Sequence, residues 1–343
     1  MLCPRITPYT LEFAFTAHTS RESLTTKTVY FLHLTDLDGN KTGVGEISPF
    51  PSLQPSFRSI ESFEQELNFF LEHINEYLEG RPLPKNSAIR FGFETALLDM
   101  RNGGVGRLYP QNILKQLSSG IPINGLVWMN DIDTMQRQIA EKIKAGFKCI
   151  KLKIGAHDFD KELNLIKQIR ETYKDSVLQI RVDANGAFSE KDVFSRLDAL
   201  AKYDVHSIEQ PLKRDSVFMA EVCKNSPLPI ALDEDMIERW WSFEQMCEWL
   251  CNLSPAYIVL KPSLVGGFKQ ADKWIDAANE VGVKWWATSA LESNIGLSAI
   301  AQWLATHPES LSTYQGLGTG QIYVNNPSAP VHLEGDRLYL DNI

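Results

Sequence analysis

The sequence lacks the features of a membrane, nucleic-acid-binding or disulfide-stapled protein. No segment approaches the roughly 18 to 20 uninterrupted apolar residues of a membrane helix. The 43 acidic residues outnumber the 34 basic ones, and a net charge of −9 would repel a phosphate backbone. The five cysteines are odd in number and form no CxxC pair, which is typical of reduced thiols. We therefore expect a cytoplasmic protein with a small-molecule partner and without nucleic-acid or membrane partners.

Further features of the sequence narrow the class of site. The seven histidines show no HxH or HExxH spacing, so a zinc site is not expected. The loop Gly103–Gly106 does not have the strand-then-GxGxxG context of a dinucleotide site. Cys247 and Cys251 stand four apart in a helical segment, but cysteine there favours core filling over a metal. The first residues also lack a charged leader followed by an apolar run.

Residues 1–120 are predicted to form an α+β capping domain, because strand patterns are followed by helical spacing. A polar loop, 16–26, separates the first two strands, and Asp38–Asn40 is typical of a hairpin turn. The expected strands are 11–15 and 28–34, and the expected helices are 57–78 and 86–102.

Residues 121–320 alternate between apolar strand runs and helix-period segments. About eight strands and seven crossover helices favour a parallel barrel over an open sheet, so the fold class is α/β with a TIM-like barrel. Residues 321–343 contain another strand pair around Gly335 and are expected to return to the cap. The predicted strands are 123–129, 149–154, 178–183, 206–209, 229–232, 256–260, 284–288 and 314–317.

Charged and amide side chains recur near the ends of successive predicted strands. The steps between the five main positions are 30, 26, 24 and 28 residues, about the length of one βα repeat. Strand ends of a parallel barrel converge on one face, so these residues should meet there. Alternation along a strand puts Lys151 with Lys153 on one face. The full set is Lys151, Lys153, Asp183, Asn185, Glu209, Asp233 and Lys261.

This set predicts a divalent cation beside a lysine base. Asp183, Glu209 and Asp233 offer the hard oxygen ligands that Mg²⁺ prefers, with positions left for a substrate carboxylate. Lys151 and the metal ion would favour the neutral amine of Lys153, which a base that removes a proton alpha to a carboxylate requires. The resulting dianion needs the metal on one side and Lys261 on the other.

Two segments after the last strands are candidates for substrate binding. Residues 287–293 end a strand with polar side chains able to bind a carboxylate, although Ser293 is equally suited to capping the next helix. The glycine-rich run 316–320 permits close backbone approach. Trp285 and Trp286 are expected to pack in the core.

Nearly the whole chain resembles the enolase superfamily, muconate-lactonizing-enzyme branch. The motifs that carry the resemblance are Lys151-Leu152-Lys153, Asp183-Ala184-Asn185, Glu209-Gln210-Pro211, Leu232-Asp233-Glu234 and Leu260-Lys261-Pro262. Within that branch the chain is most similar to the o-succinylbenzoate synthase family. The motifs for that similarity are residues 45–51 (GEISPFP), 180–185 (IRVDAN) and 289–296 (SALESNIG).

The resemblance implies a (β/α)₇β barrel under an α+β cap, and a Mg²⁺- or Mn²⁺-dependent hydro-lyase. It implies syn dehydration of 2-succinyl-6-hydroxy-2,4-cyclohexadiene-1-carboxylate, with Lys153 as both base and acid and Lys261 facing the enediolate. Lys151 completes the catalytic lysines, and the three acids match metal ligands. Substrate-binding positions are Arg181, Asn185, Ser289 and Gly316. The chain departs from related synthases at Thr288-Ser289, where two serines are common, and in the loop 16–26, which has no clear counterpart.

Other functions stay open from the sequence. A dipeptide epimerase or N-acylamino-acid racemase would use Lys153 and Lys261 as two bases, but residues 316–323 lack the acidic DxD that would hold a dipeptide amine. A Schiff-base aldolase would use Lys261 as nucleophile and leaves the aligned acids unexplained. A barrel kept only for binding is disfavoured by the intact charged set. The sequence leaves the oligomeric state, the metal ion in the cell and a racemase side activity undetermined.

Overall fold

The computed structural model describes residues 1–18 and 22–341. The N-terminal part is an antiparallel sheet of β1 (Leu2–His18), β2 (Ser23–Asp36) and β3 (Thr42–Ile47), in that order. The hairpin predicted around Asp38 is confirmed, and the Asp36 carboxylate accepts from the amides of Asn40 and Lys41 there. The predicted loop 16–26 is shorter than expected, since His18 pairs with Ser23. Residues 19–21 of that loop lie outside the described residues.

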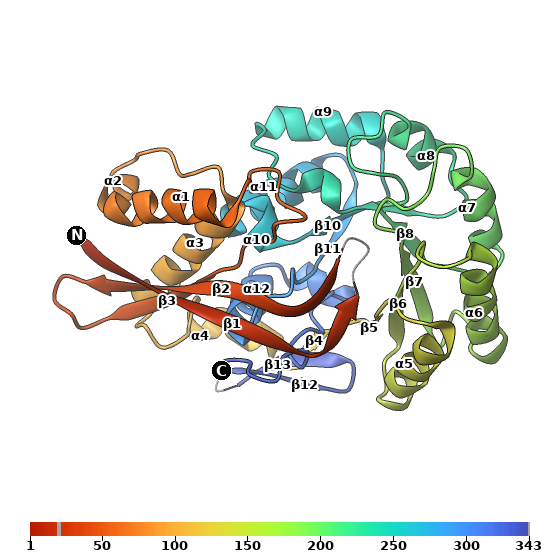
Figure 1. Cartoon of the computed structure of the whole chain (residues 1–343), viewed down its shortest axis with the longest axis horizontal. Coiled ribbons are helices and arrows are strands. Elements are labelled where there is room, and N and C mark those ends of the chain that lie inside the picture. Colours follow the sequence, from red (N-terminus) through yellow and green to blue (C-terminus); the bar gives the residue numbers. More distant parts are fainter. Residues whose placement is uncertain (19–21, 342–343) are drawn as a thin grey trace.

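Three helices pack on one face of this sheet (Figure 1). They are α1 (Ile60–Glu72), α2 (Ile74–Leu78) and α3 (Ser87–Arg101). The helix predicted over 57–78 is interrupted at His73, whose ring Nδ1 contacts the carbonyl of Phe69 at 2.8 Å. Gly45 lets β3 lie directly on α3, because a Cβ there would stand 2.0 Å from the carbonyl oxygen of Gly92. The cap therefore has its own apolar core.

Seven parallel strands form the second sheet, in the order β11-β10-β9-β8-β7-β6-β5. An eighth segment closes it into a barrel: the Gln315 amide donates to Pro122 O at 2.8 Å, and the Gly316 amide donates to Ala287 O at 2.7 Å. The predicted barrel is thus confirmed. The strands are β5 (Gly125–Val127), β6 (Cys149–Lys153), β7 (Gln179–Asp183), β8 (Ser207–Glu209), β9 (Ile230–Leu232), β10 (Tyr257–Leu260) and β11 (Lys284–Ala287).

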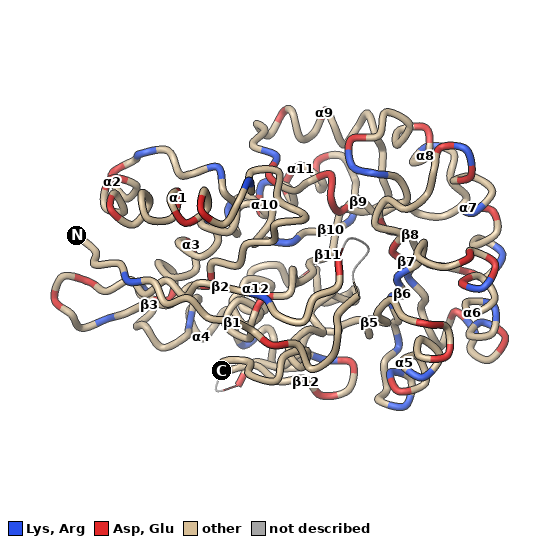
Figure 2. The backbone as a smooth tube through the Cα atoms, in the orientation of Figure 1, with Lys and Arg blue, Asp and Glu red and all other residues tan. Residues whose placement is uncertain are grey.

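Helices connect the strands and cover the outside of the barrel, and α5 to α8 carry interspersed acidic and basic residues (Figure 2). They are α5 (Ile132–Lys144), α6 (Phe159–Thr172), α7 (Val193–Ala201), α8 (Met219–Asn225), α9 (Phe243–Leu253), α10 (Pro262–Val265), α11 (Phe268–Glu280) and α12 (Asn294–Leu304). Short elements are α4 (Gln111–Leu114) and the 3₁₀ turns η1 (Lys115–Leu117), η2 (Glu234–Met236) and η3 (Pro308–Ser312). No helix in the described ranges is both long and apolar enough to span a membrane.

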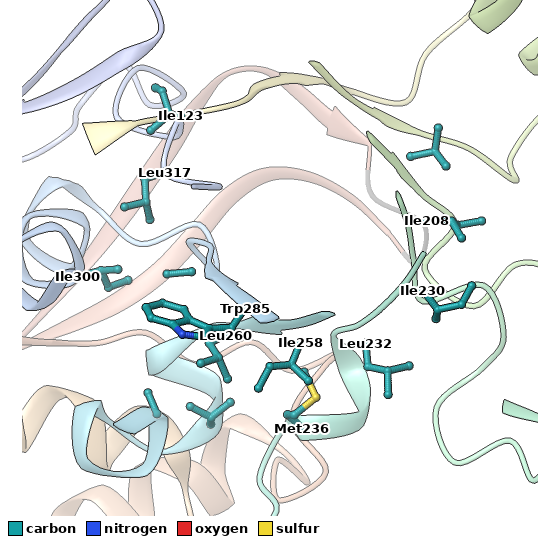
Figure 3. Packing of buried hydrophobic residues seen from close by; sticks show 14 of the residues in the cluster. Ile123, Ile208, Ile230, Leu232, Met236, Ile258, Leu260, Trp285, Ile300 and Leu317 are labelled. Atoms are coloured by element: carbon teal, nitrogen blue, oxygen red, sulfur yellow. The ribbon is translucent and has the colours of Figure 1, made fainter. Parts of the chain in front are cut away.

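Alternating strand residues separate the two faces of the barrel. Ile208, Leu232, Ile258 and Leu260 belong to the large buried cluster between strands and helices, part of which Figure 3 shows. Trp285 also belongs to this outer layer. The residues that alternate with the outer layer along the strands face the barrel interior and form a separate buried cluster. The period of two that predicted the charged residues to share an inner face is therefore seen in the packing.

The C-terminal part adds a small sheet after the eighth segment of the barrel. Strands β12 (Val331–Glu334) and β13 (Arg337–Leu340) form a hairpin that pairs with β4 (Ile121–Pro122). Before it, Tyr323 pairs with Phe13 of β1, and the Asn325 side chain bonds the backbone of β1. The tail therefore connects the cap sheet to the barrel. The domain limits 1–120, 121–320 and 321–343 stay a prediction.

Candidate active site

Strand register places the predicted charged residues side by side at one end of the barrel. Lys153 is the ladder partner of Asp183, and Asp183 is the ladder partner of Glu209. Asp233 and Lys261 directly follow β9 and β10. The chain then turns away sharply: Asn185 and Gln210 both have φ of 43°, a left-handed conformation that costs energy and often occurs at functional sites.

Ion pairs link these side chains into one cluster. The Lys151 Nζ lies 2.9 Å from Asp183 Oδ2 and 2.6 Å from Glu209 Oε1. The Lys153 Nζ lies 3.3 Å from Asp183 Oδ2 and donates to Asn185 Oδ1 at 2.6 Å. Across the site, Lys261 is paired with Asp233. The structure therefore brings together all three predicted acids and all three predicted lysines.

Burial and charge act against each other in this cluster. Burial opposes the charge of Lys151, but the surrounding carboxylates, Asp183 first, outweigh it and raise the pKa of Lys151. Burial also opposes the charge of Lys261, but the carboxylates around it, Asp233 first, together outweigh burial and raise the pKa of Lys261. Burial, with the nearby Asp183, raises the pKa of Glu209. The pKa of Asp183 is lowered, because Lys151 and Lys153 outweigh its burial.

The donor set fits a divalent cation. Glu209 Oε2 and Asp233 Oδ1 are buried and have no hydrogen-bond partner within the protein, so both have unused acceptor capacity. Three carboxylates are the ligand type that Mg²⁺ prefers. Within residues 1–18 and 22–341, however, no three acidic, His or Cys groups are already arranged as a metal cage. Instead, Lys151 and Lys261 neutralise the acids.

A pocket opens above this cluster. The substrate-binding candidates Asn185, Ser289 and Gly316 all line it, together with Lys151, Lys153 and Lys261. Gly316 is needed there because a Cβ would lie 2.1 Å from Thr288 Oγ1. The proximity expected for residues far apart in sequence is therefore present.

Arg181 lies away from the pocket that the other candidates line. It faces the inside of the barrel two residues before Asp183, on the same strand, and is 1% exposed. Its guanidinium stacks on Trp286 at 4.1 Å and donates to Tyr314 O at 2.8 Å. Alternation along a strand predicts the face of a side chain but not its depth, so Arg181 supports the barrel interior beneath the acids.

The pocket wall that comes from the cap was not predicted from the sequence. Phe50, Ser52 and Leu53 follow β3 and line the pocket, as does Trp128, which follows β5. Phe50 lies in the segment 45–51 that carried the resemblance, and this was the one available signal.

Ser293 caps α12 by accepting from the Ile295 amide. Cys251 is exposed and Cys247 partly so.

The fold and the cluster define a capped β/α-barrel with a carboxylate and lysine site at the C-terminal ends of its strands. Residues 134–338 match the family model described as enolase C-terminal domain-like. The chain is 41% identical to an o-succinylbenzoate synthase of Desulfotalea psychrophila, over 96% of both sequences. It is 30% identical to an L-Ala-D/L-amino acid epimerase of a Maribacter species, over 86% of this chain and 85% of that one.

The crystal structure of MenC from Desulfotalea psychrophila has the same architecture. It is 36% identical and superposes with a TM-score of 0.82 over 99% of both chains. The chain therefore belongs to the enolase superfamily of enzymes. It is similar in sequence and structure to the o-succinylbenzoate synthases within that superfamily.

Proposed function

We propose that this protein is an o-succinylbenzoate synthase. It would dehydrate 2-succinyl-6-hydroxy-2,4-cyclohexadiene-1-carboxylate, a small-molecule carboxylate, to o-succinylbenzoate in menaquinone biosynthesis. The observation that carries the proposal is the 41% identity to such a synthase over 96% of both chains. The pocket supports it, because Lys153 and Lys261 line the same cavity and can act on one bound molecule from two sides.

Lys153 is assigned both proton transfers. Its neutral amine takes the proton alpha to the substrate carboxylate, and the electron pair of the broken C–H bond moves into the carboxylate as an enediolate. The same Nζ, now an ammonium, gives its proton to the departing hydroxyl as the C–O bond breaks, so that water leaves. The ring becomes aromatic, which makes the second step easy. Asn185 holds the Lys153 Nζ at 2.6 Å and orients it.

The remaining charged residues stabilise negative charge. Lys261, 12% exposed at its side chain, presents an ammonium to the opposite side of the enediolate. Lys151 holds the carboxylates of Asp183 and Glu209 in place. A Mg²⁺ or Mn²⁺ ion held by Asp183, Glu209 and Asp233 would supply further positive charge to the substrate carboxylate.

A racemase or epimerase activity is the second candidate, because the chain is 30% identical to an L-Ala-D/L-amino acid epimerase. Such an enzyme would use Lys153 and Lys261 as bases on opposite faces of one carbon. Residues 316–323 contain no acid to hold a free amine, which favours an N-acyl substrate over a dipeptide.

One experiment separates the two functions. Purified protein with Mg²⁺ is given the cyclohexadiene substrate, and the aromatic product is followed by ultraviolet absorbance. An N-acylamino-acid racemisation assay is run beside it by polarimetry. We expect aromatic product, its loss with EDTA and its return with Mg²⁺. Racemisation without any aromatic product contradicts the synthase assignment, and activity that survives EDTA contradicts the metal.

The cytoplasmic location also stays a prediction. All five cysteines are free thiols, which agrees with a reducing compartment.

A further inference from the structure

One wall of the pocket is a loop whose backbone is strained. The loop 288–293 joins β11 to α12, and Ser289, Ala290 and Leu291 line the pocket. Leu291 has a φ of 63°, a left-handed conformation that a branched side chain rarely adopts. Such a conformation persists only where the surroundings hold it.

Lys27, from the cap sheet, holds the carbonyl groups of this loop. Its side chain belongs to β2, and the residue is 8% exposed. The Nζ donates to Ala290 O at 2.8 Å, to Leu291 O at 2.9 Å and to Ser48 Oγ at 2.7 Å. These three acceptors use all three of its donors. The same ammonium lies 5.2 Å from the ring centre of Phe50, another wall of the pocket.

Glu46, from the neighbouring strand, holds the other end of the loop. This residue of β3 is 1% exposed. Its Oε1 accepts from the Ser293 amide at 3.0 Å, and its Oε2 accepts from Ser293 Oγ at 2.5 Å and from the Gly296 amide at 2.9 Å. These amides belong to the first turn of α12, where a carboxylate is favoured by the helix dipole. The ammonium of Lys27 therefore binds carbonyl groups of the loop, and the carboxylate of Glu46 binds amides at its other end.

The loop also braces itself internally. The carboxylate of Glu292, 1% exposed, accepts from Ser289 Oγ at 2.6 Å and from the Ala290 amide at 2.7 Å. Thr319, from the segment after the last strand, donates to Ser289 Oγ at 3.0 Å. The orientation of Ser289 toward the pocket therefore depends on a loop whose outer backbone is held by the cap.

We propose that Lys27 and Glu46 are positioning residues that fix the loop 288–293 as the substrate-binding wall. They act through the backbone of that loop, and neither belongs to the set of Lys153 and the carboxylates that performs the chemistry. This inference rests on the proposed function for its kinetic test only.

The test uses Lys27→Met, Glu46→Gln and a control, Lys41→Met, at an exposed position of the same sheet's hairpin. Removal of charge-assisted hydrogen bonds should raise KM for the cyclohexadiene substrate about tenfold to a hundredfold in the first two variants. The change in kcat should be much smaller, and Mg²⁺ affinity should be unchanged. Hydrogen exchange should increase in peptides covering 288–296 and not in those covering β6 and β7. The control should match the wild type.

A KM within twofold of wild type, or a fall in kcat with KM unchanged, would overturn the proposal. Unchanged exchange in 288–296 would overturn it as well. If Lys27→Met does not fold, Glu46→Gln decides by the same two measurements. A wild-type protein that makes no aromatic product contradicts the proposed function instead, and the exchange measurement then still decides whether the cap positions the loop.

Discussion

Replacing Lys153 by alanine tests the assignment of the single acid and base. The substitution removes the Nζ that lies 3.3 Å from Asp183 Oδ2 and 2.6 Å from Asn185 Oδ1. Asp183 keeps its second partner, Lys151 at 2.9 Å, so no buried carboxylate loses its only counter-charge. We therefore expect the variant to fold and to bind Mg²⁺ as the wild type does.

The expected loss of turnover follows from the neighbouring amines. Lys151 is held by Asp183 and Glu209, and Lys261 is paired with Asp233, so neither is placed to take over both proton transfers. General acid–base catalysis contributes about 10² to 10⁴ in rate, and one group that serves in two steps belongs at the upper end. Lys153→Ala should therefore lower kcat about 10⁴-fold, which corresponds to about 5 kcal/mol of barrier.

Three measurements check this prediction together. Product formation is followed by ultraviolet absorbance, folding by circular dichroism, and Mg²⁺ binding by tryptophan fluorescence, since Trp128 lines the pocket. Lys148→Ala, at an exposed position just before the same strand, is the matched control. Turnover above about one hundredth of the wild-type rate, in a folded variant that binds the ion normally, would refute the single-base scheme.

Two further predictions concern the metal and the pH dependence of stability. Asp233→Asn should raise the Mg²⁺ concentration needed for half-maximal activity more than about tenfold, and an unchanged Mg²⁺ dependence would refute Asp233 as a ligand. Burial raises the pKa of Glu94 to about 7, although it accepts from the Phe268 amide at 2.5 Å. The folded protein therefore keeps Glu94 protonated to a higher pH than the unfolded chain does. The stabilisation that comes from this protonation is lost as the pH rises from about 4.5 to 7. Glu94→Gln should gain stability relative to wild type across that window, by at most about 3 kcal/mol. Urea unfolding of both proteins at pH 5 and pH 7.5 measures this difference. The same change in unfolding free energy between the two pH values in both proteins would contradict the prediction.

The barrel and its charged cluster could be predicted because their causes are local and repeated. Each βα repeat shows an apolar run followed by a charged residue, and parallel strands bring their ends to one face whatever the loops do. Asp183, Glu209 and Asp233 are close together for this reason. The outward packing of Ile208, Leu232 and Ile258 follows from the same alternation.

The rest depends on contacts between distant segments, which leave no periodic pattern. Arg181 shares a face with Asp183, yet the barrel interior is deep enough to keep its guanidinium on Trp286. Phe50 and Lys27 become part of the pocket region only because the cap sheet docks on the loop 288–293. No spacing within residues 1–50 indicates that docking. The sequence did not indicate that β1 and β2 extend into the predicted loop 16–26. Backbone pairing between strands there does not require an apolar run.

Closure of the barrel by Gln315 and Gly316 imposes an order on biosynthesis. The nascent chain leaves the ribosome with every proposed metal ligand and catalytic lysine already made by residue 261, while β5 has no partner on its outer side until residue 315 emerges. Until then β5 and β11 are open edges, which are prone to pair with other chains. A chain that ends before Gln315 would contain every proposed catalytic and metal-binding group, but its barrel would be open. Chaperones or proteases would act on such a chain before it could become active.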